Sequence, residues 1–194
     1  MQKVTIGNAE LYHGDCAVIL PQLEPVFFVT DPPYPNEYAE EYGYKPGLIE
    51  SLGITEGYIF WTAREPFPCG YTGMHVWDKK INVGRDYELI FEVGGSRRFS
   101  VFRHYLINST VAASMTGDEF NEHPSQKPVA LMMDLLLKTK TEKPICDPFM
   151  GSGTTGVAAM NLEKRFIGIE RERKYFDIAC ERIDRAQAQG RLAI

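Results

Sequence analysis

Apolar residues in this chain gather in short runs that end in a polar or glycine-rich turn. Runs of this length and composition are typical of strands that are covered on both faces of a sheet. The pattern therefore predicts strands at residues 10–13, 26–30, 58–62, 75–78, 87–93, 144–146 and 165–169.

Three other segments carry apolar residues at the spacing of one helix face. The first is expected to begin near Pro128, because proline suits the first position of a helix. The second is expected to begin near Thr154, and the third to cover residues 173–188. Strands that alternate with helices predict an α/β fold. Residues 35–57 and 94–122 lack clean periodicity, so we expect long loops there, which in compact domains tend to be functional.

Length and composition fit one globular domain, residues 1–194. The chain has 194 residues, of which 44% are hydrophobic and 24% charged, and it can bury one good-sized core. Its first residues contain no apolar signal core, and no apolar run approaches the roughly 18 residues of a membrane helix. We therefore expect a cytoplasmic protein with no membrane partner. The cysteines form no C-x-x-C pair, which predicts reduced thiols and no metal site: Cys16, Cys69, Cys146 and Cys180.

The net charge of −5 weighs against a nucleic-acid partner, because phosphate binding needs lysine and arginine. The charge is unevenly spread, however, since residues 97–104 read Arg-Arg-Phe-Ser-Val-Phe-Arg-His. A local basic face can coexist with an acidic body. This stretch is therefore either a nucleic-acid contact or a solvated surface loop.

Residues 144–170 follow the order strand, glycine turn, helix, strand and acidic residue. We call residues 147–155 the glycine loop. Gly151 and Gly153 let its backbone turn tightly and approach a ligand, and the helix that follows presents free N–H groups there. Glu170 ends the next strand, where a carboxylate can accept hydrogen bonds from both hydroxyls of an adenosine ribose.

Motifs that the glycine loop lacks limit the kinds of ligand that it can bind. It contains neither the G-K-[S/T] of a phosphate-binding loop nor the spacing of the dinucleotide fingerprint. An acid at Asp147 would repel a pyrophosphate, whereas it suits an ammonium group. S-adenosylmethionine carries both an ammonium group and a ribose, so it fits the loop better than NAD does. A purely structural glycine turn is the alternative.

A second chemical signal, which we call the tetrapeptide, is Asp31-Pro32-Pro33-Tyr34 at the end of the predicted strand 26–30. Its prolines have no N–H, so the segment presents carbonyl groups and a carboxylate as acceptors beside an aromatic ring. An exocyclic amino group of a flipped base has two N–H donors and a face that stacks on such a ring. Acceptors that draw those N–H groups out of conjugation free the nitrogen lone pair for attack on a sulfonium methyl, and positioning supplies much of the rate.

On these motifs the chain resembles the amino-methyltransferase family, which modifies adenine N6 or cytosine N4 in DNA. The tetrapeptide matches the family's catalytic D/N/S-P-P-Y/F/W, and the glycine loop matches its cofactor loop. Residues 123–128 (His-Pro-Ser-Gln-Lys-Pro) resemble the element that lines the methionine end of the cofactor. Residues 14–16 resemble the element near its adenine ring, and residues 77–80 and 87–90 the strand pair after the catalytic loop.

The resemblance implies roles for individual residues. The expected catalytic residues are Asp31, Pro32, Pro33 and Tyr34. The residues expected to bind S-adenosyl-L-methionine are Asp15, Cys16, His123, Ser125, Lys127, Asp147, Phe149, Gly151, Ser152, Gly153, Thr154, Thr155 and Glu170. The candidates for contact with double-stranded DNA, with solvated surface charge as the alternative, are Arg97, Arg98, Arg103 and His104, and more weakly Lys45.

The tetrapeptide precedes the glycine loop, and this order resembles the beta group, whose domain is circularly permuted. The implied fold is a Rossmann-like S-adenosylmethionine-dependent methyltransferase fold, with a seven-stranded, mostly parallel sheet and helices on both faces. Chain ends often lie close together, so a permutation is tolerable. Beta-group members usually carry a larger target-recognition segment than residues 95–122. Recognition would thus be minimal, shared with residues 35–57, or supplied by a partner subunit.

The leading hypothesis is site-specific methylation of adenine N6 in duplex DNA, because Asp in the first tetrapeptide position favours adenine. Serine there favours cytosine N4, which is the alternative. Pro68-Cys69 would suit methylation of cytosine carbon 5, but it follows the wrong strand. A non-catalytic DNA-binding relic would need a damaged motif, and methylation of RNA or of a protein amide disagrees with Asp31. The resemblance also allows a homodimer and a restriction–modification or phage setting.

Overall fold

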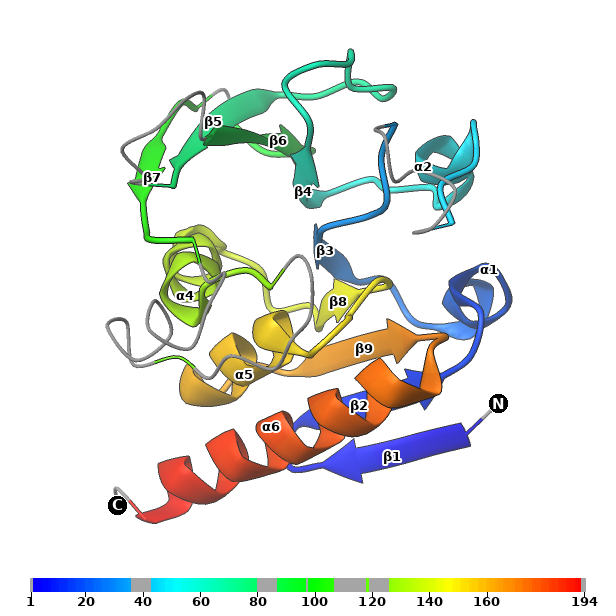
Figure 1. The fold of residues 1–194 in the computed structure, drawn as a ribbon, viewed down its shortest axis with the longest axis vertical. Helices are drawn as coiled ribbons and strands as arrows, with labels where there is room; N and C mark the ends of the chain where they lie inside the picture. Colours follow the sequence, from blue (N-terminus) through cyan, green and yellow to red (C-terminus); the bar gives the residue numbers. More distant parts are fainter. Residues whose placement is uncertain are drawn as a thin grey trace.

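A single sheet forms the centre of the computed structural model, which describes residues 2–35, 43–79, 87–96, 98–106, 118 and 126–192. Within these residues the sheet has nine strands in the order β1-β2-β9-β8-β3-β4-β6-β5-β7. Figure 1 shows them from β1 at the bottom to β6 and β5 at the top, with β7 at the left. The strands are β1 (Gln2–Ile6), β2 (Ala9–His13), β3 (Phe27–Thr30), β4 (Gly57–Trp61), β5 (Gly73–Asp78), β6 (Tyr87–Val93), β7 (Val101–Arg103), β8 (Ile145–Asp147) and β9 (Phe166–Glu170).

Strand directions place most of the carboxyl ends at the same edge of the sheet. Strands β2, β9, β8, β3 and β4 pair in parallel. Strand β6 is antiparallel to both β4 and β5, and β7 is parallel to β5. Strands β4, β5 and β7 therefore run in one direction. The segments that follow β2, β3, β5, β7, β8 and β9 all leave the sheet at one edge.

The sheet is mostly parallel, as predicted, but the predicted number of seven strands is wrong. All seven predicted strands are present, and β1 and β7 extend the sheet at its two ends. Strand β1 has no fully buried residue, and only Phe102 is buried in β7. The outermost strands of a sheet need no continuous apolar run, so the hydrophobic pattern does not reveal them. Strand β7 also lies inside the predicted long loop of residues 94–122.

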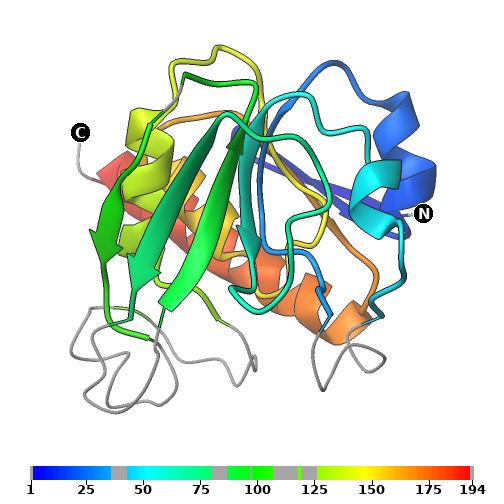
Figure 2. The same cartoon turned by 90° about the horizontal axis from the view of Figure 1, so that it is seen from above.

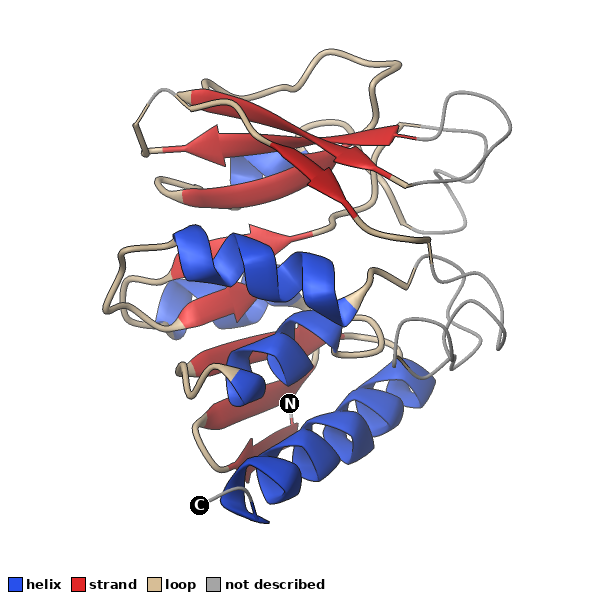
Figure 3. Ribbon diagram, turned by 90° about the vertical axis from the view of Figure 1, so that its left-hand side faces the viewer, coloured by secondary structure: helices blue, strands red, loops and turns tan. Residues whose placement is uncertain are grey.

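Helices cover both faces of the sheet, as predicted. Three helices, α4 (Val129–Lys138), α5 (Thr154–Asn161) and α6 (Arg173–Leu192), lie on one face, in front of the strands in Figure 3. The short helices α1 (Cys16–Ile19) and α2 (Leu48–Ser51) lie on the other face, as Figure 2 shows from above. A 3-10 turn at Leu20–Gln22 continues α1. In the part of the chain that the structure describes, no helix is both long and apolar enough to cross a membrane.

Gly168 in β9 has no side chain, and this lets the glycine loop pack closely on the sheet. A Cβ at Gly168 would lie 2.2 Å from the Sδ of Met150 and 2.8 Å from the Cε1 of Phe166. Met150 belongs to the glycine loop and is buried in the main core cluster with Phe166. Close packing of the interior leaves no room for an added methyl group here. Gly168 therefore fixes how closely the loop approaches β9.

We expect Gly168→Ala to lower the free energy of unfolding by about 1–3 kcal/mol, the usual cost of an added methyl group in a packed core. Gly70→Ala is the matched control, because Gly70 is exposed and a Cβ there would meet no atom within 4 Å. Urea unfolding measures both variants. Equal urea midpoints for the two variants would show that the loop does not depend on this contact.

Candidate active site

A cavity of about 590 Å³ opens at the edge of the sheet where β2, β3, β8 and β9 end. Strands β3 and β8 pair directly, but β3 leads on to β4 on one side and β8 to β9 on the other. Open α/β sheets bind ligands at such a switch point. The structure thus brings the tetrapeptide and the glycine loop together, although more than a hundred residues separate them in the sequence.

Most of the residues predicted from the sequence line this cavity. They are Asp15, Cys16, Asp31, Pro32, Pro33, Tyr34, Lys127, Asp147, Phe149, Gly151, Ser152, Thr154, Thr155 and Glu170. Lys45 lines it as well, although it was expected at the DNA. Gly153 forms the amino-terminal cap of α5. His123 and Ser125 lie outside the described residues.

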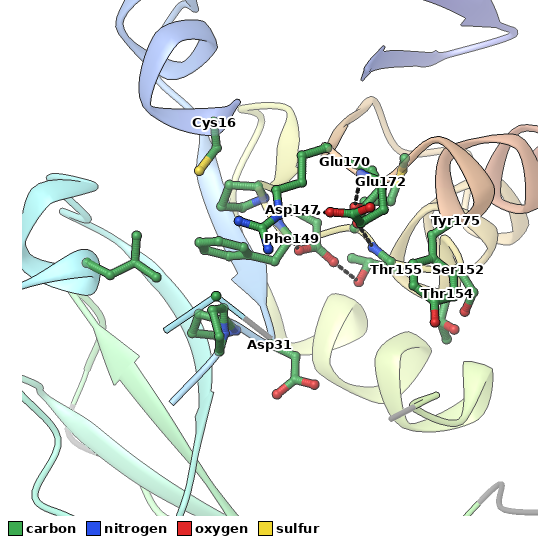
Figure 4. A pocket seen from close by; sticks show the side chains of 18 of the residues that line it. Cys16, Asp31, Asp147, Phe149, Ser152, Thr154, Thr155, Glu170, Glu172 and Tyr175 are labelled. Atoms are coloured by element: carbon green, nitrogen blue, oxygen red, sulfur yellow. Dashed lines mark hydrogen bonds and ion pairs between the residues drawn. The ribbon is translucent and has the colours of Figure 1, made fainter. Parts of the chain in front are cut away.

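Asp147 joins β3, β8 and α5 at the floor of the cavity. Its Oδ1 accepts hydrogen bonds from the hydroxyl of Thr30 at 2.7 Å and from the N–H of Phe149 at 3.2 Å. Its Oδ2 accepts one from the hydroxyl of Thr155 at 2.7 Å, the contact drawn in Figure 4. Burial raises the pKa of Asp147 from 3.8 to about 6, although these hydrogen bonds favour the charged form. This carboxyl group is therefore held mainly by neutral donors of its own chain.

The raised pKa of Asp147 predicts a pH-dependent stability. The folded protein holds the Asp147 proton more tightly than the unfolded chain does. The stability that this proton provides is complete below about pH 3.8 and is lost as the pH rises through about 6. Two pKa units correspond to about 3 kcal/mol. We expect the free energy of unfolding of the protein, minus that of Asp147→Asn, to fall by up to about 3 kcal/mol between about pH 4 and about pH 7.

Urea unfolding at several pH values measures this difference. Asp184→Asn, on the exposed side of α6, is the control and should keep the pH dependence of the unchanged protein. A difference for Asp147→Asn that stays constant over the whole range would rule out a raised pKa.

Glu170 shapes the opposite side of the cavity. Its Oε2 accepts a hydrogen bond from the N–H of Gly151 at 2.9 Å, and its Oε1 accepts one from the N–H of Glu172 at 2.7 Å. Burial raises its pKa. In Figure 4, Asp147 and Phe149 lie between Glu170 and Asp31. The carboxylate is therefore fixed at the cavity by backbone donors.

Arg182 supports the glycine loop from α6 and was missed by the sequence analysis. Its side chain is buried, and its Nη1 donates to the carbonyl of Ser152 at 2.7 Å. The same nitrogen lies 3.2 Å from the hydroxyls of Ser152 and Thr154. The available signal was a cation on the apolar side of α6, three residues after Ala179 and next to Ile183. Both of these neighbours are fully buried.

We expect Arg182→Met to lower the free energy of unfolding by about 2–4 kcal/mol. The variant keeps much of the side-chain volume but leaves the carbonyl of Ser152 buried without this charged donor. Arg185→Met, at an exposed position on the same helix, should change it by less than about 0.5 kcal/mol. Urea unfolding compares the two variants, and a loss confined to Arg185→Met would contradict the assignment.

The tetrapeptide contacts a group of buried charged side chains through Asp31. Lys127 forms an ion pair with Asp31, and its Nζ lies 3.4 Å from the Oε2 of Glu88. Glu88 also pairs with Lys79 at 2.6 Å. Burial raises the pKa of Asp31, and Lys127 counteracts that rise. The resemblance suggested that Lys127 serves the cofactor, whereas in the structure it contacts Asp31 of the tetrapeptide and Glu88.

Tyr34 and Cys69 both pack against a cluster of buried side chains around Trp61. The ring of Tyr34 packs edge-on against Trp61, with ring centroids 5.8 Å apart. This contact fixes the ring beside the cavity. Cys69 packs against the cluster of Ile49, Trp61 and Phe91 and does not line the cavity, so the structure gives no support to Pro68-Cys69 as a nucleophile. Where residues are described, no group of three or more His, Cys, Asp or Glu side chains could hold a metal ion.

The candidate DNA contacts separate into two places. Arg103 ends β7 and His104 follows it, at the edge of the sheet that holds the cavity. Arg103 pairs with Asp78 at 3.4 Å, and His104 lies 2.9 Å from Asp134. Arg98 precedes β7 and so lies toward the opposite edge. Arg97 lies outside the described residues.

Sequence comparisons place the chain among DNA methylases. The family model N6_N4_Mtase, described as DNA methylase, matches residues 74–181. The chain is 50% identical over 139 residues to the type II methyltransferase M2.DpnII of Streptococcus pneumoniae, covering 65% of this chain and 50% of that protein. It is 34% identical over 147 residues to M2.LlaDCHI of Lactococcus lactis subsp. cremoris, covering 68% and 52%. The chain thus spans about half the length of these curated relatives.

Solved structures share the fold. The M1.HpyAVI–SAM complex is 24% identical, with a TM-score of 0.60, and the match covers 91% of this chain and 99% of that one. The PvuII DNA methyltransferase, described as cytosine-N4-specific, is 16% identical, with a TM-score of 0.64 and coverage of 92% and 87%. At these identities the likeness concerns the fold, and it confirms the Rossmann-like methyltransferase architecture.

Proposed function

This chain belongs to the DNA methylase family, whose family model matches residues 74–181. On this basis we propose that it is an S-adenosylmethionine-dependent DNA methyltransferase acting on N6 of adenine. One observation carries the proposal. The tetrapeptide, the glycine loop and Glu170 border one cavity, which is large enough for a cofactor and part of a flipped base. An acceptor cluster and a nucleoside-type pocket therefore adjoin each other, as methyl transfer to an amino group requires.

The cavity residues fit S-adenosylmethionine by their chemistry. Glu170 offers two carboxylate oxygens to ribose hydroxyls, and the side chain of Phe149 offers an apolar surface in the same cavity. The amino end of α5 offers free N–H groups to the cofactor, and Asp147 offers the acidic group that suits its ammonium group. When bound, this cofactor supplies an electrophilic methyl group on a positively charged sulfur. The fold relative M1.HpyAVI is described as a complex with SAM.

The residues of the tetrapeptide hold the target amino group. The Asp31 carboxylate and the carbonyl of Pro32 accept its two N–H donors, and the ring of Tyr34 stacks on the base. The prolines limit the backbone conformations of the segment, so the acceptors are in place before the base arrives. Ionised Asp31 accepts with both oxygens, whereas a protonated carboxyl would be a weaker acceptor and would present an O–H donor on one of them.

Adenine is proposed as the target because Asp31 holds the first position of the tetrapeptide. Cytosine N4 is the alternative outcome of the same experiment. We further propose that residues 1–194 form one methyltransferase domain in which residues 95–122 contribute to target recognition. Arg103 and His104 are the proposed contacts with duplex DNA, because they lie at the edge that holds the cavity.

Methyl transfer tests the proposal directly. Purified protein is incubated with S-adenosylmethionine labelled in the methyl group and with unmethylated duplex DNA, and the product is digested to nucleosides. We expect the label in N6-methyladenine. We expect Asp31→Ala to lower kcat/KM by about 10²-fold or more. Label in N4-methylcytosine would replace adenine with cytosine, and no transfer to any DNA would refute the activity.

Calorimetry separates cofactor binding from catalysis. Glu170→Gln should weaken cofactor binding by about tenfold, the value of one hydrogen bond to a charged group, whereas Asp31→Ala should change it by less than about threefold. Glu163→Gln, at an exposed turn after α5, is the control for the loss of a carboxylate. A Glu170→Gln variant that binds as tightly as the unchanged protein would remove Glu170 from the cofactor site.

A further inference from the structure

Four charged groups lie in a row below the tetrapeptide, in the order Lys79, Glu88, Lys127, Asp31. Lys79 pairs with Glu88 at 2.6 Å, Glu88 lies 3.4 Å from Lys127, and Lys127 pairs with Asp31. Their side chains are between 6% and 20% exposed, so water screens them little. Two positive and two negative charges alternate, and the row as a whole is neutral.

The row comes from four separate parts of the chain, and Asp31 follows β3. Lys79 follows β5, Glu88 lies near the beginning of β6, and Lys127 precedes α4. Because β6 runs antiparallel to β5, Lys79 and Glu88 meet at the edge of the sheet that holds the cavity. The antiparallel half of the sheet, which the proposed mechanism does not otherwise use, thus reaches the tetrapeptide.

Aromatic rings fix the ammonium group of Lys127 in place. Its Nζ lies 5.3 Å from the ring centroid of Phe60 and 5.8 Å from that of Trp77. The Nζ of Lys79 lies 5.1 Å from the Trp77 ring. Phe60 and Trp77 are fully buried and pack edge to face. Cation–π contacts of this kind favour the charged form and limit the positions it can occupy.

We propose that Lys127 is a positioning residue that holds the Asp31 carboxylate ionised and oriented for the target amino group, and that Glu88 sets the strength of this hold. The inference rests on the proposed function and assigns the row a part in it. Lys127 and Glu88 act on Asp31 in opposite directions, since one is a cation and the other an anion. Burial and the charge of Glu88 raise the pKa of Asp31, while Lys127 lowers it.

Other charged groups also face Asp31. Lys79 lowers its pKa from the end of β5, and Asp147 faces it from the end of β8. Tyr34, in the tetrapeptide itself, interacts with Lys127. None of these is altered in the variants below. The difference between the variants therefore reports on Lys127 and Glu88.

Two substitutions should shift the pH dependence of kcat/KM in opposite directions. Lys127→Gln removes the cation, so the pH below which kcat/KM falls should rise by about 1–3 units, and kcat/KM at about pH 7 should fall by about 10²-fold. Glu88→Gln removes the anion, so the same limit should move to lower pH. Lys127→Arg keeps the charge and should restore the limit to within about half a unit. Lys140→Gln, at an exposed position after α4, is the control for loss of a lysine.

A second measurement reads the charge of Asp31 without turnover. The carboxyl carbon of Asp31 is followed by carbon-13 NMR as the pH changes, in the unchanged protein and in each variant that folds. The midpoint should rise in Lys127→Gln and fall in Glu88→Gln. Should Lys127→Gln not fold, Glu88→Gln and Lys127→Arg still carry the test, because a structural effect alone would not lower the midpoint.

The outcomes separate this inference from the proposed function. Midpoints that move in the same direction in both variants, or in neither, would overturn the inference. So would a Lys127→Gln variant that loses only cofactor affinity by calorimetry, since Lys127 would then serve the cofactor. Opposite shifts by NMR in a protein that transfers no methyl group would support the role of Lys127 and refute the activity.

Discussion

The direct parallel pairing of β3 with β8 is the constraint on which the site depends. The two strands are far apart in the sequence, and their register places the residues after Thr30 beside those after Asp147. The Thr30 hydroxyl donates to Asp147 across this pair, and the Thr155 hydroxyl donates to the same carboxyl group from α5. Three elements are thereby joined at one buried acid. Without this pairing the tetrapeptide and the glycine loop would be two unrelated turns.

Two of the acids that line the cavity, Asp147 and Asp31, have partners of different charge. Asp147 is surrounded by neutral hydroxyl and amide donors, and burial raises its pKa to about 6. Asp31 faces the ammonium group of Lys127, which opposes the effect of burial. Buried charges are costly unless they are paired, so the partner decides the role. Neutral donors suit a group that joins structural elements, whereas a cation suits a carboxylate that must accept from a substrate.

The hydrophobic pattern predicted the interior of the fold well and its edges poorly. The seven covered strands and the beginnings of α4, α5 and α6 were predicted because burial on both faces, or on one helix face, imposes an apolar pattern. Strands β1 and β7 were not predicted, because most of their side chains face solvent and impose no apolar pattern. The same reasoning explains Arg182, whose role depends on the carbonyl of Ser152 lying 30 residues away in the chain.

By itself, the sequence determined the local chemistry. Two prolines after a strand, and glycines between a strand and a helix, fix backbone conformation through their own covalent structure, so the tetrapeptide and the glycine loop could be recognised without a fold. Only the tertiary structure decided which groups these segments meet. Lys127 reaches Asp31 across 96 residues, and Arg103 and Arg98 lie toward opposite edges of the sheet although five residues separate them. Strand order and register set such contacts, and both follow from long-range packing that no short stretch of sequence encodes.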